Sequence, residues 1–251
     1  MFEKKTIKKA NCNPVLCKWQ QYITGLLLFT LSPFSFASDN QLSTQESASG
    51  WHLLFNGKDL SEWRNFNQHD VNANWVIDQG AMHLSKGGGG DLISQKVYEN
   101  FELKLEWKIS TAGNSGIFVL ADELGSQIYS HAIEIQILDN ERHSDNKISS
   151  HLSGSIYDII PSRKSSHKMA GLWNQVHIVL YNSELTVWQN GVKNAEINIG
   201  SNEWNELISQ SKFNTWQDFA QAKKGHIGLQ DHSDPVWFKN IKIKELKSLM
   251  N

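Results

Sequence analysis

Residues 101–109, FELKLEWKI, alternate strictly between apolar and charged side chains. Successive residues of a strand face opposite sides, so this pattern predicts a β-strand with one buried face and one face in water. The next stretch, SGIFVLA at 115–121, is apolar without interruption and predicts a strand covered on both faces. Further strand-like stretches follow at residues 174–182, 184–192, 225–230 and 236–246.

The connections between these strands favour an all-β fold. Asn190-Gly191 is typical of a tight hairpin turn. Only residues 201–224 place apolar side chains at helical spacing, so we expect one short helical insertion there. Many short strands, without regular alternation between strands and helices, predict a two-sheet antiparallel β-sandwich.

Residues 1–37 differ from the rest of the chain and predict a signal peptide. A lysine-rich start is followed by a short apolar run that ends in Ser35-Phe36-Ala37. We expect cleavage after Ala37 and a periplasmic or secreted protein. An uncleaved membrane anchor is the rival interpretation, which is disfavoured because Pro33 and Ser35 interrupt the apolar run.

Removing this leader changes what the chain can bind. Cys12 and Cys17 precede the apolar run, so the protein is not predicted to be a lipoprotein, and the mature chain has no thiol. Without the leader's five lysines and one glutamate, 24 basic and 26 acidic residues become 19 and 25, a net charge of −6. This charge argues against nucleic acid or an anionic membrane as partner and favours a neutral ligand. Residues 38–50 are polar and predict a flexible lead-in to a domain at 51–247.

The stretch SHAIEIQILDNERH, residues 130–143, has two different faces. Isoleucines at alternate positions form one face, whereas Glu134 and Gln136 share the other. His131 precedes this strand and Asp139 follows it. A strand with a carboxylate and a carboxamide side by side is a candidate for binding or catalysis.

Residues 225–232, GHIGLQDH, repeat this arrangement. Aliphatic side chains occupy one face, and the opposite face is predicted to carry His226, Gly228, Gln230 and His232. A solvated outer face would explain any one of these residues. The two strands together favour function, because a face with many neutral hydrogen-bonding groups suits a sugar.

Several turns and aromatic residues add candidate contacts. Asn114, before a buried strand, is either a ligand contact or a turn residue, and Tyr157 and Asp158 occupy a similar position. The glycine-rich stretch 85–91 predicts a loop between strands; a phosphate-binding loop is disfavoured because a strand, not a helix, follows. Three tryptophans are candidates for stacking on sugar rings, namely Trp173, Trp188 and Trp237.

Common hydrolase motifs are missing from the sequence. It contains no HExxH, GxSxG or paired CxxC motif. A jelly-roll glycosidase of the retaining type would carry two glutamates two or four residues apart on one strand, but here Gln136 takes the second position.

Six segments along the chain carry a resemblance to a known family. In order they are WHLLFNGKDLSEW (51–63), NFELKLEWKISTAGNSGIFV (100–119), AIEIQILDN (132–140), GSIYD (154–158), WNQVHIVLYNSELTVWQNG (173–191) and SKF…FAQAKKGHIGLQDHSDPVWFKNIKIKEL (211–213 and 219–246). Their most specific parts are EIQILDN at 134–140 and GHIGLQDH at 225–232. Together these segments resemble the 3-keto-disaccharide hydrolase domain family. Ser233 departs from the glycine that is common in the family. The resemblance implies a concanavalin A-like jelly roll that cleaves glycosides oxidised to a ketone at C3.

This substrate class removes the need for two glutamates. A C3 ketone acidifies the C2 hydrogen, so a base can remove it, the C1 substituent can leave, and water can add to the enone. The resemblance and the shared face make Glu134 and His232 the candidates for base and acid, in either order. The candidates for binding hydroxyls or the keto oxygen are Asn114, Gln136, Tyr157 and Gln230.

The resemblance leaves two roles open for a further group, His131, Asp139 and Asp231. These residues either orient the catalytic groups or bind a divalent cation such as Mn, Zn or Ca. Asp231 falls on the aliphatic side of the alternation, so it can act only if its strand ends or bulges there. The rival function is a non-catalytic, lectin-like carbohydrate-binding module on the same fold. Acidic and imidazole groups on one face favour the enzyme.

Overall fold

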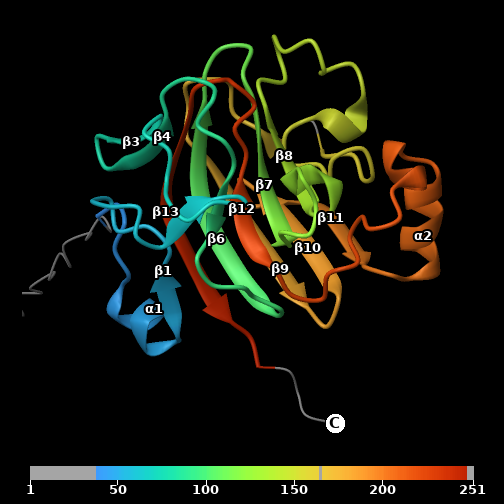
Figure 1. Ribbon diagram of the computed structural model, residues 1–251, viewed down its shortest axis with the longest axis horizontal. Helices are drawn as coiled ribbons and strands as arrows, with labels where there is room; N and C mark the ends of the chain where they lie inside the picture. The colour runs from blue at the N-terminus through green and yellow to red at the C-terminus, as the bar shows by residue number, and fades with distance from the viewer. Residues whose placement is uncertain (1–37, 164–165, 248–251) are drawn as a thin grey trace, which may run out of the picture. The chain divides into compact units, whose positions relative to one another are not determined.

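The computed structural model describes residues 38–163 and 166–247 (Figure 1). The predicted signal peptide, residues 1–37, lies outside the described residues. Within the described ranges, no helix is long and apolar enough to cross a membrane.

The larger of two sheets has eight strands, all paired in antiparallel fashion. Along its main path the order is β11 (Val192–Asn198), β10 (Glu184–Gln189), β9 (Asn174–Tyr181), β6 (Phe101–Ile109), β13 (Val236–Glu245), β4 (Ala81–Leu84) and β3 (Trp75–Asp78), with β1 (Trp51–Leu53) also paired to β13.

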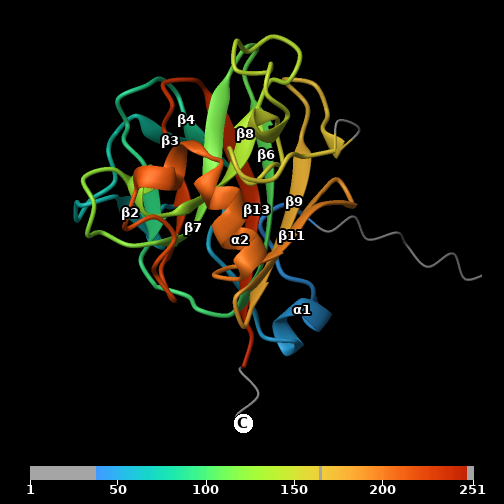
Figure 2. The same cartoon turned by 90° about the vertical axis from the view of Figure 1, so that its right-hand side faces the viewer.

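The smaller sheet has five antiparallel strands and carries most of the residues singled out above. Its order is β2 (Trp63–Asn65), β5 (Leu92–Ser94), β12 (His226–Leu229), β7 (Asn114–Ala121) and β8 (Ile133–Leu138). In Figures 1 and 2 this sheet forms a layer over the larger one.

The main hydrophobic core lies between the two sheets. All five apolar residues of β6 are buried, whereas its charged residues are partly exposed, as its alternating sequence predicts. Every residue of β7 is buried, which confirms the prediction of a strand covered on both faces. The predicted two-sheet antiparallel sandwich is therefore confirmed.

Helical structure is short and lies outside the sheets. The predicted insertion at 201–224 contains α2 (Asn202–Ser209) and the 3₁₀-helix η4 (Lys212–Thr215), and α2 contacts β11 and η4 (Figure 2). The 3₁₀-helices in the described part of the chain include η1 (Ile128–Ser130) and η2 (Ser149–His151).

The lead-in differs from the flexible segment expected from its polar composition. It contains α1 (Thr44–Ala48), whose first turn is closed by a capping box between Ser43 and Glu46. Asn40 is buried, and it and Asn240 each donate the backbone N–H to the side-chain Oδ1 of the other, while Asn40 Nδ2 donates to Gly80 O. The capping box and the hydrogen bonds between Asn40 and Asn240 hold this segment in place. Neither interaction produces a periodic pattern of apolar residues in the sequence.

Candidate active site

A cavity of about 340 Å³ lies on the outer face of the five-stranded sheet. Seven of its lining residues are candidates predicted from the sequence: Asn114, Glu134, Gln136, Tyr157, Gln230, Asp231 and His232. The other four were not predicted, namely Asp91, Gln127, Tyr129 and Lys212. The strands and loops around β7 thus bring most of the predicted candidates together.

Strand pairing explains why these side chains converge. Gln136 and Glu134 of β8 pair with Gly116 and Phe118 of β7, so all four occupy the same face. The isoleucines of β8 belong to the core between the sheets, which confirms the predicted division of faces. Gln230 follows β12 and donates its backbone N–H to Gly116 O at 2.9 Å, which places it beside the same patch.

The carboxylate of Glu134 lies across the backbone of β7 at Gly116. A Cβ atom at residue 116 would stand 2.6 Å from Glu134 Oε1 and 2.9 Å from its Cγ. Gly116 is therefore required for the observed position of this carboxylate.

Glu134 is only 8% exposed, and burial raises its pKa from 4.5 to about 8. The strongest opposing influence is the Lys212 ammonium, which lowers this pKa, whereas Asp91 and Asp145 raise it further. Gln230 hydrogen-bonds to the carboxylate. The side-chain amide of Gln136 is assigned with its nitrogen facing two acceptors. In this orientation it donates to Glu134 Oε1 at 3.1 Å and to Ser115 O at 2.9 Å. Glu134 is thus a desolvated carboxyl group in a cavity that also holds amide donors and an ammonium.

Two amide oxygens in the cavity lack partners. Asn114 Oδ1 and Gln230 Oε1 are buried, and neither has a hydrogen-bond partner among the described residues. Buried polar atoms are normally satisfied, so these oxygens are suited to accept hydrogen bonds from the hydroxyls of a ligand.

Lys212 enters the cavity from η4. Its Nζ lies 4.1 Å from the centre of the Tyr157 ring, although much of the residue is exposed. Burial lowers the pKa of this ammonium, and the carboxylate of Glu134 is the strongest influence that raises it. The two groups line one cavity, and each favours the charged form of the other.

A hydrogen-bonded network supports Tyr157 and Lys212 from behind. His151 lies between two carboxylates, with Nδ1 2.8 Å from Asp145 Oδ1 and Nε2 2.9 Å from Asp158 Oδ1. Its ring stacks on Tyr157 at 4.4 Å, and the Tyr157 hydroxyl donates to Asp145 Oδ2 at 3.3 Å. Asp158 Oδ2 also accepts the backbone N–H of Lys212 at 2.6 Å. This network fixes η4 against the loop that carries Tyr157.

Asp231 holds the glycine-rich loop. Its Oδ2 accepts the backbone N–H groups of Gly89 and Gly90 at 2.6 and 2.8 Å, and its Oδ1 accepts that of Ser233 at 2.8 Å. β12 ends at Leu229, so the condition that its strand should end before Asp231 is met.

Asp91 lies at the end of this loop, where its Oδ1 accepts the backbone N–H of Asp231 at 2.9 Å. Burial raises the pKa of Asp91 to about 6. Glu134 and Asp91 are thus two carboxyl groups of one cavity with raised pKa values.

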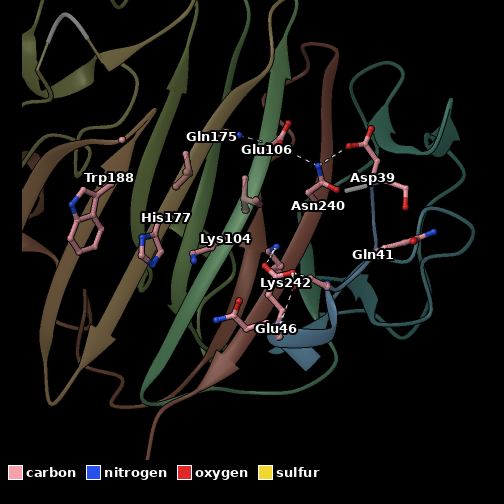
Figure 3. Close-up of a pocket in the computed structure, with 16 residues that line it drawn as sticks. Asp39, Gln41, Glu46, Lys104, Glu106, Gln175, His177, Trp188, Asn240 and Lys242 are labelled. Carbon is pink, nitrogen blue, oxygen red and sulfur yellow. Dashed lines mark hydrogen bonds and ion pairs between the residues drawn. The ribbon is translucent and has the colours of Figure 1, made fainter. Parts of the chain in front are cut away.

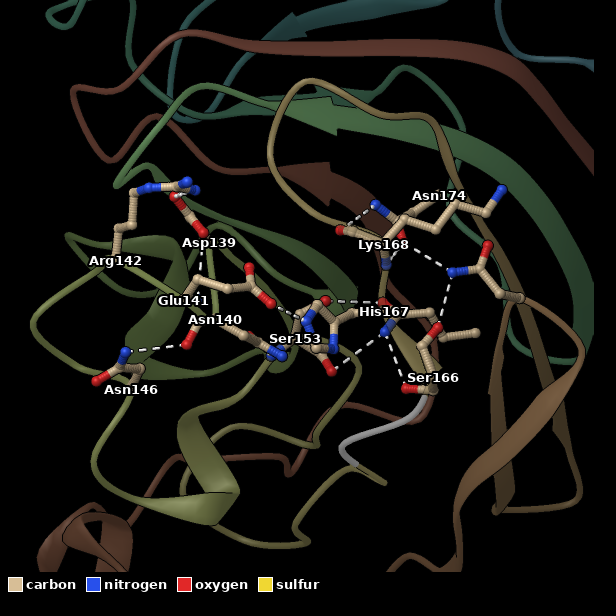
Figure 4. A network of polar contacts seen from close by, with 12 residues as sticks. Asp139, Asn140, Glu141, Arg142, Asn146, Ser153, Ser166, His167, Lys168 and Asn174 are labelled. Atoms are coloured by element: carbon tan, nitrogen blue, oxygen red, sulfur yellow. Dashed lines mark hydrogen bonds and ion pairs between the residues drawn. The ribbon is translucent and has the colours of Figure 1, made fainter.

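The structure does not bring the three predicted metal-binding candidates together. His131 Nδ1 lies 2.8 Å from Asp122 Oδ1, outside the cavity lining. Asp139 is not a lining residue either. It accepts the backbone N–H of Ala112 at 2.7 Å and that of Glu141 at 3.2 Å, the second of which is drawn in Figure 4. Within residues 38–163 and 166–247, no group of three or more histidine, cysteine or acidic side chains could hold a metal ion.

His226 is also separate from the cavity. Its Nδ1 lies 2.6 Å from Ser94 O, and the pairing of β12 with β7 shifts register next to it. The backbone oxygen of a neighbouring strand therefore holds this ring away from Glu134.

A larger cavity, of about 740 Å³, lies over the eight-stranded sheet and is bounded on one side by the lead-in (Figure 3). Trp188 lines it and stacks on His177 at 4.9 Å. Glu46 pairs with Lys242, which lowers the pKa of this carboxyl group. The cavity does not combine a carboxyl group of raised pKa with unpartnered amides among the described residues, so we assign the chemistry to the smaller one.

The other two tryptophans proposed for sugar stacking also lie away from the site. Lys108 Nζ lies 4.3 Å from the ring centre of Trp237 and 5.2 Å from that of Trp173. Lys108 belongs to β6 and Trp237 to β13, so these rings pack with lysines over the larger sheet.

The model of the family described as the 3-keto-alpha-glucoside-1,2-lyase-like domain matches residues 50–244. The chain belongs to this family. The resemblance found in the sequence is thereby confirmed, and the matched range contains every residue of the candidate site.

Individual relatives support the same membership. The chain is 35% identical over 243 residues to a 3-keto-disaccharide hydrolase of Bacteroides thetaiotaomicron, a match that covers 84% of this chain and 83% of the relative. Two crystal structures of Parabacteroides distasonis proteins assigned as glycosyl hydrolases are also similar. The first is 30% identical with a TM-score of 0.78, and covers 84% of this chain and all of that one. The second is 27% identical with a TM-score of 0.63, and covers 78% and 99%. The jelly-roll class expected for the family is thus confirmed.

The residues that sequence analysis missed come from loops and 3₁₀-helices. Lys212 lies in the SKF segment that contributed to the family resemblance, so a signal for it existed. Tyr129 lies in η1 and His151 in η2, where no strand or helix period marks a face. Their positions depend on contacts between segments far apart in the chain.

Proposed function

We propose that this protein cleaves the glycosidic bond of glycosides that carry a ketone at C3 of one sugar, by elimination followed by hydration. The relative named 3-keto-disaccharide hydrolase and the description of the family as lyase-like support this substrate and this route. The observation that carries the proposal is a buried carboxyl group, Glu134, in a cavity that is also lined by the ammonium of Lys212 and by amides.

The reaction begins with proton transfer from carbon. A base takes the proton from C2, the electrons of the C2–H bond form the C1=C2 double bond, and the C1–O bond breaks. The leaving oxygen takes up a proton, which gives the free alcohol and an enone. Addition of water across C1=C2 then yields the 3-keto sugar, so the sum is hydrolysis.

Glu134 is the base in this scheme. Its raised pKa makes the ionised form a stronger base than an ordinary carboxylate, and values near the working pH suit proton transfer. C2, which carries the hydrogen, is bonded to C3, the carbonyl carbon. The base that takes the hydrogen and the charge that stabilises the enolate oxygen must therefore lie close together. Lys212, which lines the same cavity as Glu134, supplies that charge.

The remaining lining residues bind and orient the sugar. Asn114 Oδ1 and Gln230 Oε1 accept hydrogen bonds from the sugar hydroxyls, and Gln136 and Gln230 also hold the carboxylate of Glu134 in place. His232 is exposed and lines the cavity, where it protonates the leaving oxygen. Tyr157 stays neutral in this scheme, because burial and Asp145 raise the pKa of its hydroxyl.

The test is turnover of a 3-keto-disaccharide and of the same disaccharide without the ketone. We expect cleavage of the first substrate only, with Glu134→Gln slower by about 10²–10⁴-fold. Asn205→Ala, a change in α2 outside the cavity lining, is the control and should keep the wild-type rate. Equal cleavage of both disaccharides would contradict the proposal. Binding without turnover would favour the lectin-like module.

A further inference from the structure

Tyr129 is an unusual side chain on this surface. It is 41% exposed, and it is the single aromatic residue among the large hydrophobic side chains that are exposed in the described part of the chain. The others are aliphatic or methionine: Val76, Ile77, Val97, Leu124, Ile148, Met169 and Leu172. An exposed aromatic ring beside a cavity is typical of a surface that binds a ligand.

The fold holds this ring in a defined place. Ile128, its neighbour in η1, is fully buried in a small cluster with Ile93 and Phe118 on the outer side of the five-stranded sheet. The ring of Tyr129 lies 6.1 Å from that of Trp216, with 42° between their planes. A side chain anchored in this way loses little conformational entropy when a ligand binds to it.

Trp216 is itself supported from behind. Its ring meets that of Phe213 edge to face at 5.1 Å, and Phe213 stacks on Phe219 at 3.8 Å. Phe213 and Phe219 are buried. The aromatic edge formed by Tyr129 and Trp216 is therefore continuous with the core.

This aromatic edge adjoins the proposed reacting groups. Tyr129 and Gln127 line the same cavity as Glu134. Lys212 Nζ lies 5.9 Å from the centre of the Trp216 ring and 4.1 Å from that of Tyr157. The ammonium thus lies near Tyr157, a candidate sugar contact, and near Trp216 of the aromatic edge.

We propose that Tyr129 and Gln127 form the subsite for the leaving group and select a second pyranose ring there. This inference rests on the function proposed above. The C–H face of a pyranose is apolar and packs on the Tyr129 ring, while the exposed amide of Gln127 hydrogen-bonds to its hydroxyls. A small alkyl leaving group would gain neither contact.

The experiment compares kcat/KM for a 3-keto-disaccharide and for the corresponding methyl 3-keto-glucoside. We expect Tyr129→Ala to lower the ratio of kcat/KM for the disaccharide to kcat/KM for the methyl glucoside by about 10-fold, which corresponds to about 1.4 kcal/mol. Tyr129→Phe should keep most of the wild-type ratio. Leu124→Ala is the matched control, because Leu124 lies in the same loop, is 87% exposed and is not part of the cavity lining.

The two proposals fail in different ways. An unchanged ratio in Tyr129→Ala, with normal wild-type turnover of both substrates, would overturn the subsite and leave the reaction intact. A change of the same size in Leu124→Ala would also overturn it, because the effect would then belong to the loop. A wild-type protein that cleaves neither substrate would contradict the reaction and the subsite together.

Discussion

Glu134 on β8 and Gly116 on the neighbouring β7 lie so close together that a Cβ atom at residue 116 would stand 2.6 Å from Glu134 Oε1. The pairing of Gly116 with Gln136 fixes this approach, because it sets the register of β7 against β8. The absence of a side chain at one residue thus determines where the carboxylate of another can lie.

Gly116→Ala should therefore displace the Glu134 carboxylate. A shift of about 1 Å in a catalytic group can reduce the rate by about 10²-fold, and we expect a loss of that order in kcat. The measurement is a double-mutant cycle with Glu134→Gln. If Gly116 acts through Glu134, the double variant should be no slower than Glu134→Gln alone. Additive losses would mean that Gly116→Ala damages the site in another way.

The pH dependence of kcat/KM should follow the ionisation of Glu134. Because burial raises this pKa to about 8 and the base must be ionised, kcat/KM should rise about tenfold per pH unit below about pH 8 and then level off. Initial rates at low substrate concentration between about pH 5 and about pH 9 measure this directly. A rate that falls over the same interval would assign Glu134 as the acid.

Glu134→Gln should become more stable than the wild type as pH rises. The folded pKa of Glu134 is about 8 and its ordinary value is 4.5, so the unfolded chain releases this proton first. The wild type consequently loses stability between about pH 4.5 and about pH 8, by an amount on the order of a few kcal/mol. The thermal midpoints of wild type and Glu134→Gln should be similar near about pH 4.5, and the midpoint of Glu134→Gln should become the higher one towards about pH 8. A lower midpoint for Glu134→Gln at the upper limit would mean that the ionised carboxylate holds a structural network.

Export remains a prediction from the sequence. The basic leader, the apolar run and Ser35-Phe36-Ala37 predict a mature chain that begins at Ser38. N-terminal sequencing of protein from the native host tests this, and recovery of intact Met1 in a membrane fraction would contradict it.

Strand alternation explains why much of the fold and part of the site could be predicted. The period of two in β6 and β8 fixes which side chains enter the core, and it therefore placed Glu134 and Gln136 together on the outer face. Pairing of β12 with β7 then brought Gln230 beside them.

The same reasoning fails where the chain leaves a strand. His131 and Asp139 flank β8, but Asp122 binds the first and backbone amides bind the second. Lys212 and Tyr129 reach the cavity from 3₁₀-helices, and their positions follow from tertiary contacts that have no period in the sequence. Local periodicity thus predicts faces of strands, whereas loop residues require the folded structure.

The most direct test of the proposed reaction uses a 3-keto-disaccharide with deuterium at C2. If Glu134 removes this atom before the C1–O bond breaks, kcat/KM should show a normal primary isotope effect and the 3-keto sugar should lose the label to water. Glu134→Gln controls for exchange that does not need the enzyme's base. Equal rates for labelled and unlabelled substrate, with deuterium retained at C2, would mean that the C2–H bond never breaks and would contradict elimination.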